Sequence, residues 1–302
     1  PYTSPDYPPL LARIDDAPAL LWVRGDPLVA WRAQVAVVGS RDATPGGLAN
    51  ARTFAEALVA AGLVVTSGLA TGIDGAAHAA ALDAGGTTIA VCGTGLDVVY
   101  PRRHGQLAAR IADAGALVSE LPPGTPPKPD HFPRRNRIIA GLSLGTVVME
   151  ANLESGSLIT ARLAAEQGRE VFAVPGSIHS PTAHGCHRLL RQGAALVESI
   201  DDVLAELAPL ARVLGEAIVA RIGPVAAAAA RARPQVPARS RAVARDDDTT
   251  RVLHALGHDP VSVDEIVARS GLTAATVAGM LTVLELDGVV AAQAGARYVR
   301  LA

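Results

Sequence analysis

Residues 35–47 read Val-Ala-Val-Val-Gly-Ser-Arg-Asp-Ala-Thr-Pro-Gly-Gly, so a short apolar run passes directly into a glycine-rich turn. An uninterrupted apolar run is typical of a strand that is covered on both faces of a parallel sheet. Pro45 suits the first turn of a following helix, because the N–H that it lacks would have no partner there. The stretch therefore predicts a strand, a turn and a helix in succession, which is the repeating unit of a parallel sheet.

The same alternation continues to about residue 210. Seven strands are predicted, at 35–38, 63–66, 87–91, 116–119, 146–150, 170–174 and 195–198. Helices are predicted at 45–61, 73–84, 104–114, 134–143, 157–167, 184–192 and 201–209. The predicted fold class is α/β, a parallel sheet with helices on both faces, and ligands bind such sheets where the strand-to-helix turns gather.

The composition changes after residue 210. The next segment combines prolines and arginines without a periodic apolar face, which is typical of a linker. Helices at 249–256, 263–268 and 274–286 then precede a hairpin candidate at 288–299, which is the order of a winged-helix module. We therefore predict an N-terminal extension packed on the core (1–34), a sheet domain (35–210), a helix with an Arg/Pro/Ala-rich linker (211–245) and a winged-helix-like domain (246–302).

Composition excludes several classes of protein. With 302 residues and 49% hydrophobic content, the chain can bury a large core. It has no apolar run of membrane-spanning length and no leader pattern, so we expect a cytoplasmic protein without a membrane partner. Its two cysteines lack CxxC spacing, which fits a reducing compartment. The cluster of His179, His184, Cys186 and His187 matches no zinc pattern, so neither a metal nor a cofactor is expected.

The net charge is close to zero, with 27 Lys and Arg against 29 Asp and Glu. A polyanion would therefore have to bind a local basic patch rather than a general positive field. Residues 100–140 form such a patch, with three acids against seven basic residues: Arg102, Arg103, Arg110, Lys128, Arg134, Arg135 and Arg137. The chain has only two Trp, four Tyr and three Phe, so a face built from many stacking rings is not expected.

The first candidate phosphate site is the turn Gly39-Ser40-Arg41. Backbone N–H groups and the dipole of the following helix favour an anion there, and Arg41 adds a bidentate donor. A tight turn with a solvated arginine explains the same residues equally well. The turn lacks the GxGxxG dinucleotide fingerprint, and no GxxxxGK[ST] motif occurs in the chain, which argues against a Walker-type NTPase.

The second candidate is Ser155-Gly156-Ser157, which follows Glu150 and Glu154 and begins a predicted helix. Glu150 is expected to end the preceding strand. Either serine could cap the helix, while the small side chains let a phosphate or ribose approach its amides. The motif gains weight because one strand separates it from the basic stretch Arg134-Arg135-Asn136-Arg137.

Asp74 and His78 lie one helical turn apart, after the glycines Gly68 and Gly72. An acid–base pair is conceivable from this spacing. A structural role is favoured, because no nucleophile accompanies the pair and an aspartate near a helix N-terminus offsets the helix dipole. No catalytic residue is therefore predicted.

The C-terminal domain is acidic, with eight acids against four arginines across 246–302. The predicted second helix of the helix-turn-helix, within 273–288, contains no Lys or Arg, and such a surface repels phosphate. A protein contact, or a weak contact through Arg297 and Arg300, is more plausible than sequence-specific DNA reading.

Taken together, the motifs resemble the DprA/Smf family (DNA-processing protein A). The resemblance covers about residues 20 to 200 and is carried by an ordered set of motifs: Val35-Ala-Val-Val-Gly-Ser-Arg41, Ser67-Gly-Leu-Ala-Thr-Gly-Ile-Asp74, Tyr100-Pro101, Phe132-Pro-Arg-Arg-Asn-Arg-Ile-Ile-Ala-Gly-Leu-Ser143, Ser155-Gly-Ser-Leu-Ile-Thr-Ala161 and Val174-Pro-Gly176. The C-terminal domain is similar in position to the winged-helix domain of many members.

The resemblance implies an extended Rossmann-like domain that binds single-stranded DNA without known catalysis. It also implies a homodimer that helps to load the RecA recombinase during natural transformation. The implied nucleic-acid-binding residues are Gly39, Ser40, Arg41, Gly68, Gly72, Lys128, Arg134, Arg135, Asn136, Arg137, Ser155, Gly156 and Ser157.

Two other functions remain open at this point. A nucleotide-processing enzyme like the LOG phosphoribohydrolases shares the Rossmann-like core, but its PGGxGTxxE signature is replaced here by the region of Glu150 and Ser155-Gly-Ser157. A protein adaptor that acts through the acidic C-terminal domain would bind a partner with residues 246–302 and no nucleic acid with the core.

Overall fold

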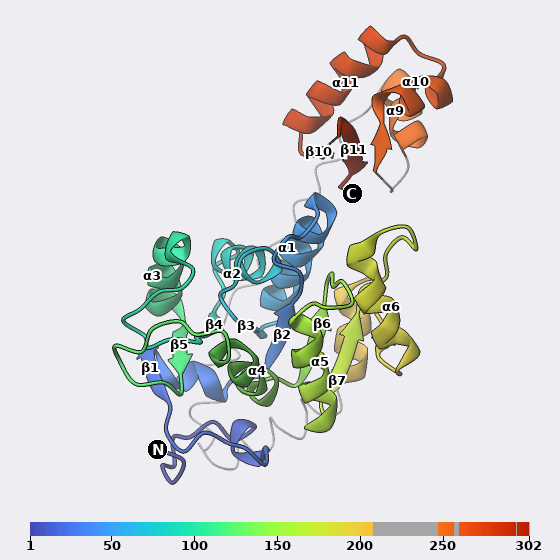
Figure 1. Ribbon diagram of the computed structural model, residues 1–302. Coiled ribbons are helices and arrows are strands. Elements are labelled where there is room, and N and C mark those ends of the chain that lie inside the picture. The colour runs from blue at the N-terminus through green and yellow to red at the C-terminus, as the bar shows by residue number, and fades with distance from the viewer. Residues whose placement is uncertain (208–246, 257–259, 294, 302) are drawn as a thin grey trace. The chain divides into compact units, whose positions relative to one another are not determined.

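The computed structural model describes residues 1–207, 247–256, 260–293 and 295–301 (Figure 1). The chain divides into two compact units, a larger one that holds most of the first 207 residues and a smaller C-terminal one. The predicted linker at 211–245 lies outside the described residues, as does the end of the helix predicted at 201–209. The two units are described separately below.

The larger unit is built on one eight-stranded sheet. Seven strands run parallel, which confirms the predicted sheet, and β1 pairs with β5 in the antiparallel direction. The strand order is β1-β5-β4-β3-β2-β6-β7-β8. The strands are β1 (Trp22–Gly25), β2 (Gln34–Val38), β3 (Val64–Ser67), β4 (Thr88–Val91), β5 (Ala116–Ser119), β6 (Gly145–Val148), β7 (Glu170–Ala173) and β8 (Ala195–Leu196).

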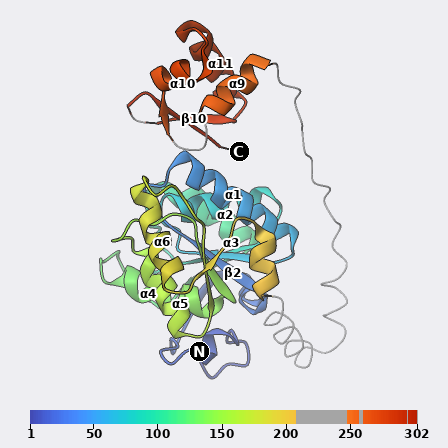
Figure 2. The ribbon, with the colours of Figure 1, turned by 90° about the vertical axis from the view of Figure 1, so that its right-hand side faces the viewer.

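Helices cover both faces of this sheet (Figures 1 and 2). One layer holds α1 (Pro45–Ala60), α2 (Ile73–Asp83) and α3 (Gly105–Ala114), together with a helix at 200–207; the other holds α4 (His131–Leu142), α5 (Ser157–Glu166) and α6 (His184–Arg191). Alternate residues of β2 serve the two layers. Val35 and Val37 pack with α1 and α2, while Ala36 and Val38 pack with α4 and α5, because successive side chains of a strand point to opposite faces.

In the larger unit, three of the predicted elements have a boundary that differs from the structure by two residues or more, and most of the others agree to within one. Helix α4 begins at His131 rather than at residue 134, because Pro133 is well tolerated in a first helical turn. Strand β6 ends at Val148, so Glu150 follows the strand instead of ending it. Strand β8 has two residues rather than four.

The strand order reverses between β2 and β6. The strands that follow β2 in sequence, β3 to β5, lie on one side of it, whereas β6 to β8 lie on the other. In doubly wound sheets the turns at this reversal diverge and leave a crevice at the carboxyl ends of the strands. The turn after β2 and the turn after β6 therefore face each other, and the Ser40 N–H donates to the Glu150 carbonyl at 2.7 Å.

The C-terminal unit has the predicted winged-helix arrangement. It contains α9 (Asp247–Leu256), β9 (Val261–Ser262), α10 (Val263–Ser270), α11 (Ala274–Leu286), β10 (Val290–Gln293) and β11 (Arg297–Arg300), with sheet order β10-β11-β9. A capping box between Ser262 and Glu265 begins α10, and Gly271, with a φ of 69°, ends it.

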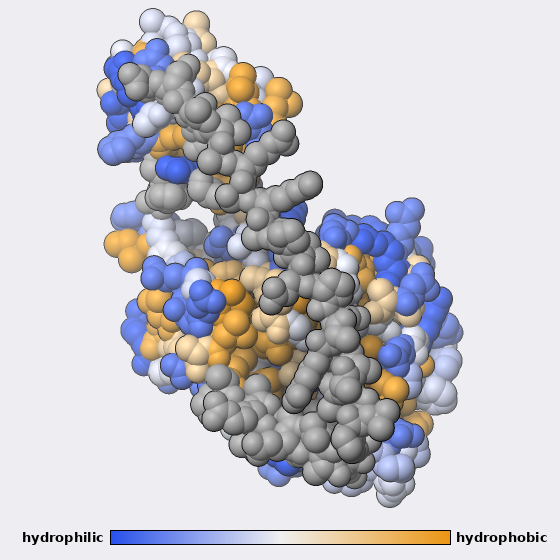
Figure 3. Space-filling model, turned by 180° about the vertical axis from the view of Figure 1, so that it is seen from behind, coloured by the Kyte–Doolittle hydropathy of each residue, from blue (hydrophilic) through white to orange (hydrophobic). Residues whose placement is uncertain are grey.

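The surface of this unit also carries hydrophobic side chains, as the space-filling view shows (Figure 3). The most exposed is Leu286 at the end of α11, which is 83% exposed. Among the described residues, no single helix is long and apolar enough to cross a membrane; α10 and α11 meet that test only jointly, across a 112° bend. Both helices contribute to the core of this unit through side chains such as Ile266 and Leu281.

Candidate nucleic-acid interface

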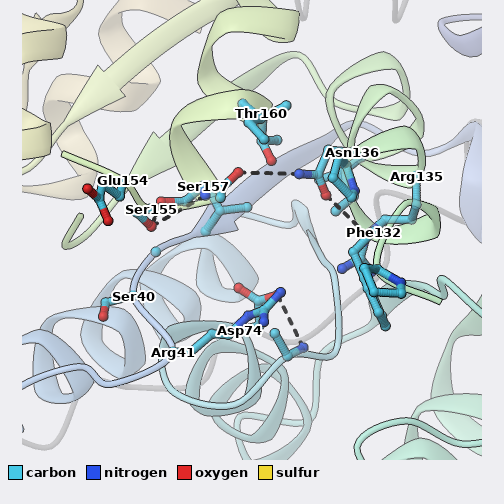
Figure 4. A pocket seen from close by; sticks show the side chains of 18 of the residues that line it. Ser40, Arg41, Asp74, Phe132, Arg135, Asn136, Glu154, Ser155, Ser157 and Thr160 are labelled. Atoms are coloured by element: carbon cyan, nitrogen blue, oxygen red, sulfur yellow. Dashed lines mark hydrogen bonds between the residues drawn. The ribbon is translucent and has the colours of Figure 1, made fainter. Parts of the chain in front are cut away.

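A cavity of about 760 Å³ lies at the strand-order reversal (Figure 4). Its walls are the turn after β2, the segment that leads into α4, and the turn before α5. Of the thirteen predicted site residues, nine line it: Gly39, Ser40, Arg41, Lys128, Arg135, Asn136, Ser155, Gly156 and Ser157. Gly68, Gly72, Arg134 and Arg137 lie outside its lining.

Two exposed cations, Arg41 and Lys128, border the cavity. Neither forms an ion pair within the part of the chain that the structure describes. The Arg41 guanidinium lies 5.9 Å from the centre of the Phe132 ring, a cation–π distance that holds it over the cavity. The Ser40 hydroxyl accepts the N–H of Asp42 at 3.2 Å and so fixes the turn that carries Arg41.

The turn before α2 supports the Gly39-Ser40-Arg41 turn through backbone contacts. The Ile73 N–H donates to the Ser40 carbonyl at 3.2 Å, and the Thr71 hydroxyl donates to the Arg41 carbonyl at 3.3 Å. Gly72 has a φ of 74°, and a Cβ there would collide with the Ser40 carbonyl and lie 2.6 Å from the Arg41 oxygen. Gly72 therefore shapes the cavity wall without lining it.

Arg135 lies beneath the cavity and is only 5% exposed. Its guanidinium donates to the carbonyls of Gly68, at 2.6 Å, and Val91, and thereby ties the ends of β3 and β4 together. A Cβ on Gly68 would lie 2.6 Å from that guanidinium, so only glycine leaves room for it. Most donors of Arg135 are already used, which makes it a structural cation rather than a free phosphate ligand.

Asp74 faces this arginine. Its carboxylate accepts the N–H groups of Gly68 and Ala70 at 3.1 and 3.2 Å. Burial raises the pKa of Asp74, and the positive charge of Arg135 opposes that rise. The two buried charges therefore compensate each other below the cavity.

His78 is fully buried and does not line the cavity. Its Nδ1 lies 2.7 Å from the Thr88 hydroxyl, which itself donates to the Val65 carbonyl. Burial lowers the pKa of His78 to about 3, so the ring is neutral at physiological pH. These contacts support the structural interpretation of Asp74 and His78 over the acid–base one.

Arg134 and Arg137 lie on other sides of α4. Arg137 forms a bidentate ion pair with Glu120, at 2.9 and 2.7 Å, and also contacts Asp16 of the N-terminal segment at 2.9 Å. The Arg134 side chain is 66% exposed and lies 3.4 Å from Glu120. Arg137 therefore joins the N-terminal segment to α4, whereas Arg134 pairs with Glu120, which follows β5. The structure brings neither arginine to the cavity.

The N-terminal turn of α5 forms the opposite wall. The N-cap is Gly156, which has no side chain, and the Ser155 hydroxyl makes only a long contact of 3.4 Å with the Ser157 N–H. The predicted serine cap is therefore weak. The Asn136 amide donates to the Gly156 carbonyl at 3.3 Å and links α4 to this turn.

An aromatic pair at the rim of the cavity is not among the residues predicted from the sequence. The rings of Tyr100 and Phe132 lie 5.3 Å apart, and Tyr100 is 47% exposed. A Cβ on Gly93 would lie 2.9 Å from the Phe132 ring, so the absence of a side chain at Gly93 leaves room for the ring. One feature of the sequence could have indicated this pair: each aromatic residue directly precedes a proline within the basic segment 100–140. The total number of aromatic residues does not reveal that these two rings lie together.

Within the described residues, no group of three His, Cys, Asp or Glu side chains could hold a metal ion. The His184 and His187 rings lie 6.4 Å apart, and each contacts a backbone carbonyl, of Ile178 and Gly176 respectively.

The lining of the cavity therefore combines exposed cations, the amides at the start of α5 and aromatic rings.

Comparison with known proteins gives consistent matches. A family model described as DNA recombination-mediator protein A matches residues 1–208, and one described as DprA winged helix domain matches residues 235–296. Protein Smf of Escherichia coli is 43% identical over 306 residues, which covers 100% of this chain and 76% of that protein. DNA processing protein DprA of Streptococcus pneumoniae is 50% identical over 200 residues, which covers 66% of this chain and 71% of the relative.

Solved structures agree. The X-ray structure of DprA from Streptococcus pneumoniae superposes with a TM-score of 0.65 and 50% identity, over 67% of this chain and 71% of that one. The structure of DNA processing protein A from Helicobacter pylori superposes with a TM-score of 0.62 and 30% identity, over 67% and 93%. That work describes a unique single-stranded DNA binding mode for the Helicobacter protein.

Proposed function

Because this chain belongs to the DNA recombination-mediator protein A family, we propose that its cavity binds single-stranded DNA and that the protein acts in recombination. The observation that supports this proposal most directly is the position of Arg41 and Lys128. Both are exposed cations that line one cavity, together with the N-terminal turn of α5. Phosphates would pair with these cations and with the helix amides. The role is binding rather than catalysis.

The aromatic pair explains a preference for single strands. Tyr100 and Phe132 present ring faces beside the cations, so a base can stack there while its phosphate contacts Arg41. In a duplex the bases are already stacked and paired, and they cannot reach the rings without strand opening. The same cavity therefore selects the unpaired strand.

The proposal includes two protein partners, a second copy of this chain and the RecA recombinase during natural transformation. A homodimer is supported by the edge of the sheet at β8, which pairs only with β7 among the described strands and where Leu196 is 53% exposed. The acidic C-terminal unit, with the exposed Leu286, supports a protein contact rather than a DNA contact. Handling of RecA follows from the role of a recombination mediator.

Replacing both cavity cations, in Arg41→Ala/Lys128→Ala, is expected to weaken binding of a labelled oligothymidylate by at least about 100-fold, since each charged contact contributes about 1.5–3 kcal/mol. The salt dependence should also fall, by a slope of about 1.4 for two phosphates. Fluorescence anisotropy at several salt concentrations measures both effects. The matched control is Arg52→Ala/Arg110→Ala, which removes the same charge away from the cavity.

Equal losses in the two double variants would mean that general charge, and not this cavity, binds the DNA. If folded wild-type protein binds neither single-stranded nor duplex oligonucleotides, the proposed function is wrong. Release of free base from nucleoside monophosphates would then be measured, because that reaction identifies the phosphoribohydrolase alternative.

Phe132→Ala is expected to weaken single-strand binding by about 1–3 kcal/mol, the usual contribution of one stacked base. Phe132→Tyr, which keeps the ring, should bind almost as well as wild type. An oligonucleotide with abasic positions provides the cross-check by anisotropy. Wild type should lose affinity for it, whereas Phe132→Ala should lose little more; equal losses would argue against base stacking on this ring.

A further inference from the structure

A second groove, of about 840 Å³, lies on the other side of α5. It is bordered by α5, the start of β7 and α6, and Figure 1 shows α5 between α4 and α6. The groove and the cavity share three lining residues at the beginning of α5: Glu154, Ser155 and Ile159. The two hollows therefore meet around the N-terminal turn of this helix.

The second groove is lined by three arginines, Arg162, Arg169 and Arg188, and by two acids, Glu154 and Glu170. Arg162 has only a distant partner, Glu166 at 3.9 Å, and both side chains are more than half exposed, so this pair is weak. Arg188 forms no ion pair within the described part of the chain. The groove therefore has cationic groups that a phosphate can approach.

Arg169 is the most constrained of the three. Its Nη2 donates to the Leu10 carbonyl at 3.0 Å, while its Nε is buried and has no partner in the structure. Burial and the positive charge of Arg13 both lower the pKa of Arg169, so an added anion would relieve an unfavourable environment. The like charge of Arg13 beside Arg169 is therefore an electrostatic reason for this groove to attract an anion.

The floor of the groove is apolar. Leu158 and Leu189 are largely buried there, and Leu153 at the junction with the cavity is 49% exposed. A simple anion would gain nothing from such side chains. A single strand presents both phosphates and unpaired base faces, so it matches arginines combined with an apolar floor.

We propose that the single strand held in the cavity continues around the N-terminal turn of α5 into this groove, where Arg162, Arg169 and Arg188 neutralise its phosphates. This inference rests on the proposed function and extends it from a pocket to a path. Helix α5 has 10 residues and is about 15 Å long, so the groove adds contacts for nucleotides beyond those in the cavity. Affinity should therefore rise with oligonucleotide length.

The test compares oligothymidylates from about 4 to 16 nucleotides by anisotropy. Arg162→Gln/Arg169→Gln/Arg188→Gln should bind the shortest oligonucleotides like wild type but lose the gain with length, and its salt slope for the longest should fall by about 2. Because Arg169 also holds the Leu10 carbonyl, Arg162→Gln/Arg188→Gln provides a second variant, with a slope reduced by about 1.4. Arg52→Ala/Arg110→Ala again serves as the control.

The outcomes separate the two proposals. Absence of binding at every length by the wild type defeats the proposed function itself. Wild-type binding that does not strengthen with length, or variants that keep the full gain, overturn only the path through the groove. Light scattering on each variant tests whether these arginines belong to an interface between copies of the chain. A changed oligomer mass would assign them to such an interface and would also overturn the proposed DNA path.

Discussion

Replacing Arg135 with leucine is expected to lower the free energy of unfolding of the larger unit by about 3–5 kcal/mol. The variant leaves the buried Asp74 carboxylate without its compensating charge and removes the donor to the carbonyls of Gly68 and Val91. The cost should shrink at lower pH. Without Arg135 the pKa of Asp74 rises further above its value in the unfolded chain. As the pH falls, Asp74 of the folded variant therefore becomes protonated first, which removes the uncompensated buried charge and restores part of the lost stability.

Urea titration followed by tryptophan fluorescence measures this loss. The only two tryptophans, Trp22 and Trp31, lie in the larger unit, so the signal excludes the winged-helix unit. Arg134→Ala is the matched control from the same helix, and its exposed side chain should contribute at most about 1 kcal/mol. Titrations at about pH 5 and about pH 7.5 test whether the difference in unfolding free energy between wild type and Arg135→Leu is smaller at the lower pH.

A double variant sharpens the assignment. Adding Asp74→Asn to Arg135→Leu removes the uncompensated charge, so the pair should cost less than the sum of the single changes. If Arg135→Leu shifts the urea midpoint no more than Arg134→Ala does, the guanidinium is not the structural cation described above.

Gly72→Ala is expected to destabilise the larger unit by about 3 kcal/mol and to weaken single-strand binding at least about tenfold. The methyl group would enter a backbone conformation with a φ of 74° and would press on the carbonyls of Ser40 and Arg41. The turn that carries Arg41 must move to make room. Binding should therefore fall although Gly72 itself does not line the cavity.

Gly62→Ala provides the matched control for this change. Gly62 has a φ of 80°, but a Cβ there meets nothing within 4 Å, so only the conformational cost of about 1–2 kcal/mol applies. Its DNA affinity should equal that of wild type in the same anisotropy assay. Equal effects of the two variants on binding would show that the close approach to Ser40 does not position the cavity.

The parallel sheet could be predicted because its strands are continuous apolar runs. Every residue of β2 is buried, and such a run has one plausible placement, between two helical layers. Strand β1 could not be predicted in the same way. All four of its residues are exposed and it ends at a glycine, so neither burial nor alternation marks it in the sequence.

The basic stretch of α4 illustrates what a sequence cannot resolve. Arg134, Arg135 and Arg137 look equivalent as letters, but neighbouring residues of a helix point in directions about 100° apart. One is exposed, one lies under the cavity, and one faces the N-terminal segment. Their charge count predicts one basic patch, but tertiary packing brings only Arg135 to the cavity and turns the other two away from it.

Lys128 carries the chain's single lysine ammonium, and it borders the cavity. A reagent that acylates lysine side chains can therefore modify only Lys128. The acylation rate of that amine reports directly on whether the cavity is filled. The same confinement applies to any enzyme that acetylates lysine. One modification would remove a charge from the proposed DNA site and leave every other side-chain cation, all of them arginines or histidines, untouched.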